Sequence, residues 1–565
     1  MYRLAGNQKP FLLILIFLVC FSPFLEVFGI SLIFPLITLA TGQKISDVDL
    51  PGQLKYFVSI ENIQFNNLAF TILFIALLKI LISLLLVYLR SKIAVNLRAI
   101  WTEKIIYSAI YGKFKNLNKN RVGSYIETIS SETRKAANSI ITSVKIIERL
   151  LLFVFLFSVL ALSNPIPTLI LITILFSIVF LLKKFGVFKS YSRGEDLQRY
   201  SQSITLNSVE ILNNIRLIKI YNYYKSALIK IKKSLNNYSR ERLLYEVSNK
   251  IPNIILESGL IIIVILTLIF LYNKGQGNIL KAIPNLSLIL VLAARISSIL
   301  GNLSKAIIDC NIGLANINSV YNTITSKNDL EDTQNGKTLK RISHQIEFVK
   351  LSFGWSKKSP LILNQVNINF YKGINLIIGP SGSGKSTIAS LLMGLIKPES
   401  GEIKIDGFSY DSFSLKSIRE NIGFVTQEDE FIYGSFLDNL KIAAQYASFD
   451  DLVRACKLAN AHNFIENTPY GYNTLVEENG SSLSGGQRQR LSLARALINK
   501  KSVYIFDEVT NALSKEDEIL VQDTIKKISS ESIVIQISHL SSSINYADIV
   551  YKINKNGIVT TVKHD

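Results

Sequence analysis

A glycine-rich segment, Gly379 to Ser386, has the residue types and spacing of a loop that binds phosphate. It follows the apolar run Ile374 to Ile378 and precedes a helical pattern, so a strand, a loop and a helix should meet there. Backbone N–H groups at a helix N-terminus bind phosphate oxygens, Lys385 supplies positive charge to the β- and γ-phosphates, and Ser386 can ligate Mg²⁺. The expected phosphate-binding residues are Gly379, Pro380, Ser381, Gly382, Ser383, Gly384, Lys385, Ser386 and Thr387.

Two adjacent carboxylates, Asp507 and Glu508, end the apolar run that begins at Val503. Such a pair suits the division of labour in phosphoryl transfer, because Asp507 is placed to hold the metal ion and Glu508 to polarise the attacking water. An apolar strand ending in two acids is weak evidence by itself. Together with the upstream phosphate loop, it predicts a site that hydrolyses a nucleotide.

Long apolar runs fill the first 325 residues, and a membrane-crossing helix needs about 20 such residues. The segments between them are basic: residues 90–149 hold 12 Lys and Arg against 4 Glu, and residues 183–250 hold 14 against 5 acids. Basic loops stay in the cytoplasm, so both segments belong on that side. Six spans are predicted, at about Pro10 to Ala40 (kinked by Pro23 and Pro35), Leu68 to Leu89, Ile147 to Ser163, Ile166 to Leu182, Ile254 to Tyr272 and Pro284 to Ile307.

The chain changes character after about residue 325, where a polar, turn-rich stretch is followed by short apolar runs that alternate with helical patterns. The expected fold is therefore an all-α six-helix transmembrane domain followed by an α/β P-loop nucleotide-binding domain. We expect the first over residues 1–325, a linker over 326–340 and the second over 341–565. Spans two to five should continue as long helices into the cytoplasm, because apolar residues repeat there at helical spacing.

Composition narrows the possible partners. Of the 565 residues 48% are hydrophobic and 18% charged, with a formal net charge of +20. Most of this excess lies in the two basic segments beside the spans, so we interpret it as membrane topology and expect no nucleic-acid partner. Three cysteines and four histidines lie apart without ligand spacing, which argues against disulfides and structural zinc.

The segment Leu483-Ser484-Gly485-Gly486-Gln487 resembles the signature motif of ABC (ATP-binding cassette) ATPases. The resemblance covers the chain from about Ile346 onward and implies ATP and Mg²⁺ as cofactors. It implies that Trp355 stacks on adenine, that Gln427 senses the γ-phosphate and the metal, and that His539 contacts the γ-phosphate. It also implies that the signature residues contact ATP held by another cassette, namely Ser484, Gly485, Gly486 and Gln487.

One cassette and six spans resemble an exporter-type half-transporter, which must pair with a second copy of itself. By analogy with that class, coupling helices near Val122 to Thr133 and Leu206 to Ile218 carry the movement, and the protein sits in the cell inner membrane with its cassette in the cytoplasm. Two departures concern coupling between the sites: the loop Asn511 to Ser514 ends in serine where aspartate is usual, and Leu540 stands where arginine is common.

We single out four charged residues within the predicted spans, where charges are costly and often functional: Glu26, Lys79, Glu257 and Arg295. Either they pair across helices and hold the bundle together, or they line a cargo cavity in which Lys79 and Arg295 face an anionic head group. Stretches around Glu26, Glu257 and Arg295 resemble bacterial lipid-linked oligosaccharide flippases. Asn253 and Asn302 depart from that resemblance, which implies arginine at both places.

The leading hypothesis is therefore an ATP-driven flippase for a lipid-linked oligosaccharide or a similar amphipathic anion, with membrane lipids as its surroundings. A peptide or toxin exporter is the second hypothesis, and an ATP-gated channel or membrane regulator is the third. Leu54, Phe57 and Val58 have the spacing of a short amphipathic helix that grazes lipid tails, although an ordinary loop would fit equally well.

Overall fold

A computed structural model describes most of the chain and divides it into two compact units, residues 1–112 with 117–330 and residues 113–116 with 331–565. The described residues are 9–40, 65–112, 122–163, 190–273, 279–325, 335–355, 360–426, 430–477, 480–509, 515–539 and 541–563.

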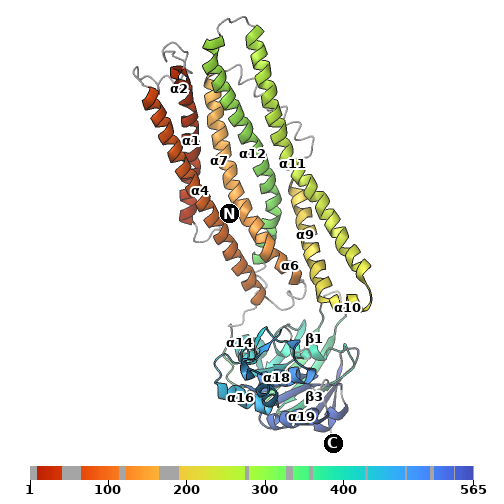
Figure 1. The fold of residues 1–565 in the computed structure, drawn as a ribbon. Helices are drawn as coiled ribbons and strands as arrows, with labels where there is room; N and C mark the ends of the chain where they lie inside the picture. Colours follow the sequence, from red (N-terminus) through yellow and green to blue (C-terminus); the bar gives the residue numbers. More distant parts are fainter. Residues whose placement is uncertain are drawn as a thin grey trace. The chain divides into compact units, whose positions relative to one another are not determined.

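The described part of the first unit is helical, and its long helices run side by side (Figure 1). The helix α4 has 46 residues, which gives a length of about 70 Å at 1.5 Å per residue, well beyond the roughly 30 Å of a hydrocarbon core. The helices are α1 (Lys9–Ser31), α2 (Ile33–Ala40), α4 (Phe65–Ile110), α6 (Val122–Glu127), α7 (Thr133–Ser163), α9 (Ser190–Asn213), α10 (Ile215–Ile220), α11 (Tyr224–Asn273) and α12 (Ile279–Thr325), with a π-helical turn η3 (Thr128–Glu132) before α7.

The first predicted span is interrupted close to the second of its two prolines. Pro23 lies inside α1, and the helix breaks at Leu32. Pro35 falls in the first turn of α2, where its missing N–H leaves no helical hydrogen bond unmade. The break fits the expected effect of Pro35, because in a continuous helix its ring would clash with the carbonyl of Ser31, four residues before it.

Two described helices are long and apolar enough to cross a membrane, Leu13–Ile37 and Phe65–Ile110. They coincide with the first and second predicted spans. The fourth predicted span, at residues 166–182, and the amphipathic segment around Phe57 lie outside the described residues. The third, fifth and sixth fall on α7, α11 and α12, which also extend well beyond them.

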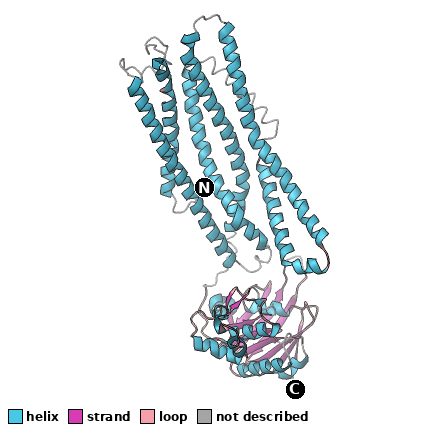
Figure 2. Ribbon diagram, in the orientation of Figure 1, coloured by secondary structure: helices cyan, strands magenta, loops and turns pink. Residues whose placement is uncertain are grey.

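The second unit is an α/β domain, with strands and helices as coloured in Figure 2. A six-stranded sheet runs in the order β12-β11-β3-β10-β9-β6, and its strands β11, β3, β10, β9 and β6 are parallel. A four-stranded antiparallel sheet has the order β2-β1-β4-β5. The strand bounds are β1 (Gln345–Phe353), β2 (Leu363–Tyr371), β3 (Gly373–Ile378), β4 (Ser400–Ile405), β5 (Phe408–Ser409), β6 (Ile422–Val425), β7 (Gly434–Ser435), β8 (Leu475–Val476), β9 (Val503–Asp507), β10 (Ile533–Ile537), β11 (Ile549–Ile553) and β12 (Val559–Lys563).

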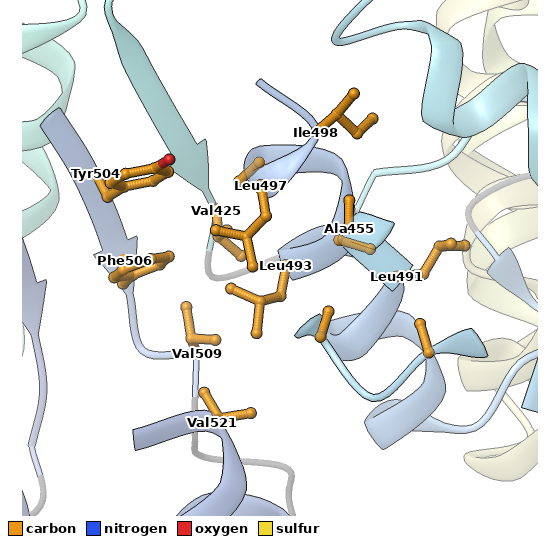
Figure 3. Close-up of a cluster of buried hydrophobic side chains, with 14 of the residues drawn as sticks. Val425, Ala455, Leu491, Leu493, Leu497, Ile498, Tyr504, Phe506, Val509 and Val521 are labelled. Atoms are coloured by element: carbon orange, nitrogen blue, oxygen red, sulfur yellow. The ribbon is translucent and has the colours of Figure 1, made fainter. Parts of the chain in front are cut away.

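Helices cover this sheet, among them α13 (Lys385–Leu392), α16 (Phe449–Leu458), α18 (Gly485–Leu497) and α19 (Lys515–Ser529). Figure 3 shows Leu493 and Leu497 of α18 directed toward β9, whose Tyr504 and Phe506 rings stack with centroids 6.0 Å apart. All five residues of β9 are buried, as expected for a central parallel strand. Removing these apolar side chains from water is a main source of the stability that fixes the strand ends.

Candidate active site

Three neighbouring parallel strands bring the predicted catalytic segments to one edge of the sheet. In the strand register, Ile537 of β10 lies opposite Ile377 of β3 on one side and Asp507 of β9 on the other. The phosphate loop therefore leaves β3 beside the place where Asp507 ends β9, and His539 follows β10 by two residues. The carboxyl ends of parallel strands are the usual place for ligands in open α/β sheets.

The phosphate loop is closed by its own lysine. Lys385 Nζ donates hydrogen bonds to the carbonyl oxygens of Gly379 (2.9 Å) and Pro380 (3.1 Å), and its side chain is buried. Gly384 turns the chain into α13 with φ 98°, a left-handed conformation that favours glycine. Burial lowers the pKa of Lys385, while the charges of Glu508 and Asp507 act in the opposite direction. The loop thus presents a fixed cation at the N-terminus of α13.

Asp507 is a buried carboxylate with unused hydrogen-bonding capacity, since its Oδ1 has no partner. Burial raises the pKa of Asp507, and the negative charge of Glu508 raises it further. The hydrogen bond with Ser386 and the positive charge of Lys385 act in the opposite direction. A buried carboxylate oxygen without a partner normally calls for an ion or a ligand. The Asp507 carboxylate and the Ser386 hydroxyl are hard oxygen ligands, so these residues fit a Mg²⁺ ion.

Glu508 and His539 form a close pair. His539 Nε2 lies 2.7 Å from Glu508 Oε1, and the glutamate side chain is only 10% exposed against 39% for the histidine. The backbone N–H of Glu508 donates to Ile537 O at 3.0 Å, which ties the residue to the end of β10. Its φ is 55°, a strained conformation for a residue with a side chain. The β9 and β10 ends thus fix both the position and the direction of the Glu508 carboxylate.

The signature segment begins a helix. Ser484 is the N-cap of α18: its hydroxyl accepts from Gln487 N (3.2 Å), and Gln487 Oε1 accepts from Ser484 N (3.0 Å). Gly485 and Gly486 occupy the first turn between them. Arg488 donates to Leu483 O at 2.7 Å and holds the loop before the helix. A capped helix start with two glycines leaves backbone N–H groups available for an anion.

Of the other predicted nucleotide contacts, Trp355 belongs to the antiparallel sheet side of the domain, and the rest lie outside the described residues. Trp355 follows β1, is 40% exposed, and meets Phe353 edge to face with centroids 5.4 Å apart, so one face of its ring remains open for stacking. Gln427, the loop from Asn511 to Ser514, and Leu540 lie outside the described residues.

In the membrane domain, Glu26 joins two of the predicted intramembrane cations. Its Oε2 lies 2.8 Å from Lys79 Nζ and its Oε1 3.7 Å from an Nη atom of Arg295, which links α1, α4 and α12. Among the described residues, the cluster holds one acid and two bases, which gives a formal net charge of +1. The side chain of Glu257 is not among those described.

One cation in this region was missed by the sequence reasoning. Arg149 of α7 donates a hydrogen bond to the backbone oxygen of Asn302. A positive charge therefore lies beside one of the two positions where an asparagine replaces an expected arginine. Arg149 lies at the start of the third predicted span, and this position could have identified it as an intramembrane cation. It was counted only among the basic residues that set the membrane topology.

The fold and the site together define a P-loop nucleotide-binding domain fused to a helical membrane domain. Residues 363–511 match the family model described as "ABC transporter", and residues 12–296, half of the chain, match the model of the ABC transporter transmembrane region. The chain belongs to the ABC transporter family. Members with this arrangement are exporter-type half-transporters, and ABC exporters couple ATP hydrolysis to transport.

The matches to curated relatives cover about half of this chain or less. The chain is 38% identical over 235 residues to the alpha-hemolysin translocation ATP-binding protein HlyB of Proteus vulgaris, a match covering 41% of this chain and 33% of the relative. It is 35% identical over 294 residues to multidrug resistance protein 1 of Entamoeba histolytica, covering 51% of this chain and 22% of the relative. The matched stretch spans about a third of the length of the hemolysin and leukotoxin relatives.

A solved structure agrees over nearly the whole chain. The structure of a bacterial Atm1-family ABC exporter with ATP bound superposes with a TM-score of 0.78, 19% sequence identity, and coverage of 98% of this chain and 94% of that one. At this identity the likeness concerns the fold, which is that of an ABC exporter. It confirms the predicted order of a helical transmembrane domain followed by a nucleotide-binding domain.

Proposed function

We propose that this protein is an ATP-driven exporter of the cell inner membrane that works as a homodimer. The observation that carries the proposal is the meeting of Lys385, Asp507, Glu508 and His539 at one sheet edge, in a chain that also contains a transporter's membrane domain. The proposed cofactors are ATP and Mg²⁺. The proposed activity is ATP hydrolysis coupled to movement of a cargo across the membrane.

The residues divide the hydrolytic work. Lys385, already fixed by two carbonyl groups, binds the outer phosphates in the proposed mechanism, and the N–H groups that begin α13 bind their oxygens. Glu508 orients and polarises the attacking water, and His539 holds that carboxylate and contacts the γ-phosphate. Asp507 and Ser386 would hold Mg²⁺, which when bound neutralises negative charge on the phosphates.

A homodimer is proposed because the N-terminus of α18, which carries the signature motif, can bind an anion. Ser484 and Gln487 use their side chains to cap α18, so the N–H groups of Gly485 and Gly486 are the remaining donors of its first turn. In the family these donors meet the ATP of the other cassette. Both Glu508 and His539 are present, so two copies of this chain would form two competent sites.

The proposed cargo is an amphipathic anion, such as a lipid-linked oligosaccharide moved from the cytoplasmic to the outer leaflet. Support comes from the net charge of +1 at the cluster of Glu26, Lys79 and Arg295 and from Arg149 beside Asn302. Glu26 neutralises only one of its two neighbours, and an anionic head group would neutralise the other.

A peptide or toxin exporter is the second candidate. The favouring observation is that two of the relatives are an alpha-hemolysin and a leukotoxin translocation ATP-binding protein. An ATP-gated channel or membrane regulator is the third candidate, and the complete hydrolytic set argues against it.

The test is ATPase activity of the full chain in liposomes, titrated with a polyprenyl-pyrophosphate glycan, with peptides and with hydrophobic drugs, alongside a leaflet-accessibility assay for the glycolipid. Stimulation by the glycolipid, together with its ATP-dependent appearance in the outer leaflet, is expected. Stimulation by peptides alone would favour the second candidate. Ion current without coupled ATP turnover would favour the third.

A further inference from the structure

A buried carboxylate, Glu132, joins three elements of the membrane domain. It is 1% exposed and ends η3, directly before α7. Its Oε1 accepts hydrogen bonds from Gln198 Nε2 (3.0 Å) and Gln202 Nε2 (2.8 Å), both on α9. Its Oε2 accepts from Ser319 Oγ of α12 (2.7 Å) and from Thr128 Oγ1 (3.0 Å). Four hydrogen bonds thus hold one side chain between η3, α9 and α12.

A second carboxylate strengthens the same junction. Glu127, the last residue of α6, accepts from Ser201 Oγ (2.7 Å) and Thr205 Oγ1 (2.8 Å) of α9. Burial raises the pKa of Glu127, but these hydrogen bonds and others outweigh it and leave the pKa below its usual value. The α6–η3 segment is therefore bound to α9 by two side chains rather than one.

The junction is also tightly packed. A Cβ atom added to Gly194 of α9 would lie 2.7 Å from the Cα atom of Ile312 on α12, so the two helices touch backbone to backbone. The turn η3 is π-helical, with Thr133 N donating to Thr128 O. Such turns interrupt α-helices and are frequent at functional sites.

Two of the three joined elements overlap the predicted coupling helices, and the third precedes the nucleotide-binding domain in the chain. The segment α6–η3 covers one predicted coupling helix, α9 runs into the other at residues 206–218, and α12 is the last helix before that domain in the chain. We propose that Glu132 is a positioning residue that makes these three elements move as one body when ATP binds. This inference rests on the proposed ATP-driven function.

A polar junction suits this role better than an apolar one. Four directed hydrogen bonds fix orientation, whereas apolar contacts allow sliding between alternative packings. A buried carboxylate that loses its donors pays a large desolvation cost, so partial separation of the elements is penalised. The Glu132 carboxylate therefore favours two states of the junction. In one state all of its hydrogen bonds are made, and in the other the elements are separated and water hydrates the carboxylate.

Two variants separate hydrogen bonding from charge and shape. Glu132→Gln keeps an oxygen for Gln198 and Gln202, and its new NH₂ can donate to the hydroxyls of Ser319 and Thr128. Glu132→Leu keeps comparable bulk and removes every hydrogen bond. Glu195→Ala, at an exposed position of α9, is the matched control.

The experiment measures hydrogen exchange of the full chain in liposomes, with and without ATP. All variants carry Glu508→Gln as well, and ATP binding is measured on the same samples. We expect the hydrogen-exchange rates of three segments to change together when ATP is added, namely residues 122–133, 198–213 and 312–325. This joint response should be seen in the Glu508→Gln chain, in the control and in the Glu132→Gln chain. In the Glu132→Leu chain we expect residues 198–213 to exchange about tenfold faster without ATP and to lose the ATP response, with ATP affinity unchanged.

Retention of the joint ATP response by Glu132→Leu would overturn the inference. So would loss of ATP binding in Glu132→Gln, because residue 132 would then support folding only. No ATP response in the Glu508→Gln chain itself would instead contradict the proposed function, so the two failures are distinct.

Discussion

The imidazole of His539 and the carboxylate of Glu508 lie 2.7 Å apart although 31 residues separate them in the chain. The parallel pairing of β9 with β10 creates this contact, because Asp507 and Ile537 lie opposite each other, Glu508 follows Asp507 directly, and His539 follows Ile537 by two residues. The histidine restrains a carboxylate that otherwise has several rotamers. The following predictions begin from this pair.

Replacing Glu508 with glutamine should leave ATP binding intact and stop turnover. The amide keeps the shape of the side chain but cannot accept a proton from water, so kcat should fall by about 10²- to 10⁴-fold. Nucleotide affinity and steady-state ATPase activity of the purified chain would be compared with those of the native sequence. Undiminished hydrolysis would show that Glu508 is not the group that polarises water.

Replacing His539 with alanine should reduce kcat while affecting ATP affinity less. The change removes the contact that orients Glu508 and exposes no apolar surface, since His539 is already 39% exposed. A fall of at least about tenfold in kcat is expected. His344, which is exposed, provides the control His344→Ala. Equal kcat in both variants would contradict a role for the pair.

Replacing Lys385 with alanine should weaken ATP binding by about tenfold or more, because a charge-assisted contact to phosphate is lost. The two carbonyls that it now binds, those of Gly379 and Pro380, would also lose their donor. Lys397→Ala is the matched control, since Lys397 forms an exposed ion pair with Asp411. Fluorescent nucleotide titration distinguishes the two variants.

Replacing both Lys79 and Arg295 with glutamine should impair glycolipid translocation more than basal ATPase activity. The pair of changes removes the cations proposed to bind cargo and leaves Glu26 without its two partners. Glu26→Gln, which retains both cations, should preserve translocation better, although it lowers stability because both cations lose their acid. Equal loss of ATPase activity and translocation, with poor expression, would indicate that the cluster only supports packing.

Cys456 should resist alkylation in the folded protein. It is fully buried, and burial raises its pKa to about 11 from 9.0. The thiol therefore stays protonated in the native domain, and its contribution to stability is complete below pH 9 and is lost as the pH rises toward about 11. Mass spectrometry of the peptide containing Cys456, before and after unfolding in guanidinium, measures the difference. Rapid alkylation of the native protein at pH 7.5 would contradict the prediction.

The fold class followed from the sequence because its two signals are strong and local. Apolar length identified the first two spans, and the phosphate loop between strand and helix identified the nucleotide-binding domain. The interruption at Leu32 fits the kink expected from Pro35, whereas Pro23 lies inside the helix α1.

The candidate site was less predictable where it depends on distant pairing. The approach of Glu508 and His539 needs the strand order of the sheet, which the chain order does not reveal. The sequence also left open whether the intramembrane charges pair, and the contacts of Glu26 with Lys79 and Arg295 show that three of them do. The junction at Glu132 could not be anticipated, because its donors come from three segments far apart in the chain.

The φ of 55° at Glu508 has a consequence for evolution and engineering. Holding a residue with a side chain in this region costs about 1 kcal/mol or more, and glycine or asparagine would relieve it. A library selected only for thermal tolerance should therefore enrich those two residues at position 508. The same selection would remove the proposed catalytic carboxylate, so thermal stability and ATP turnover place opposite demands on residue 508.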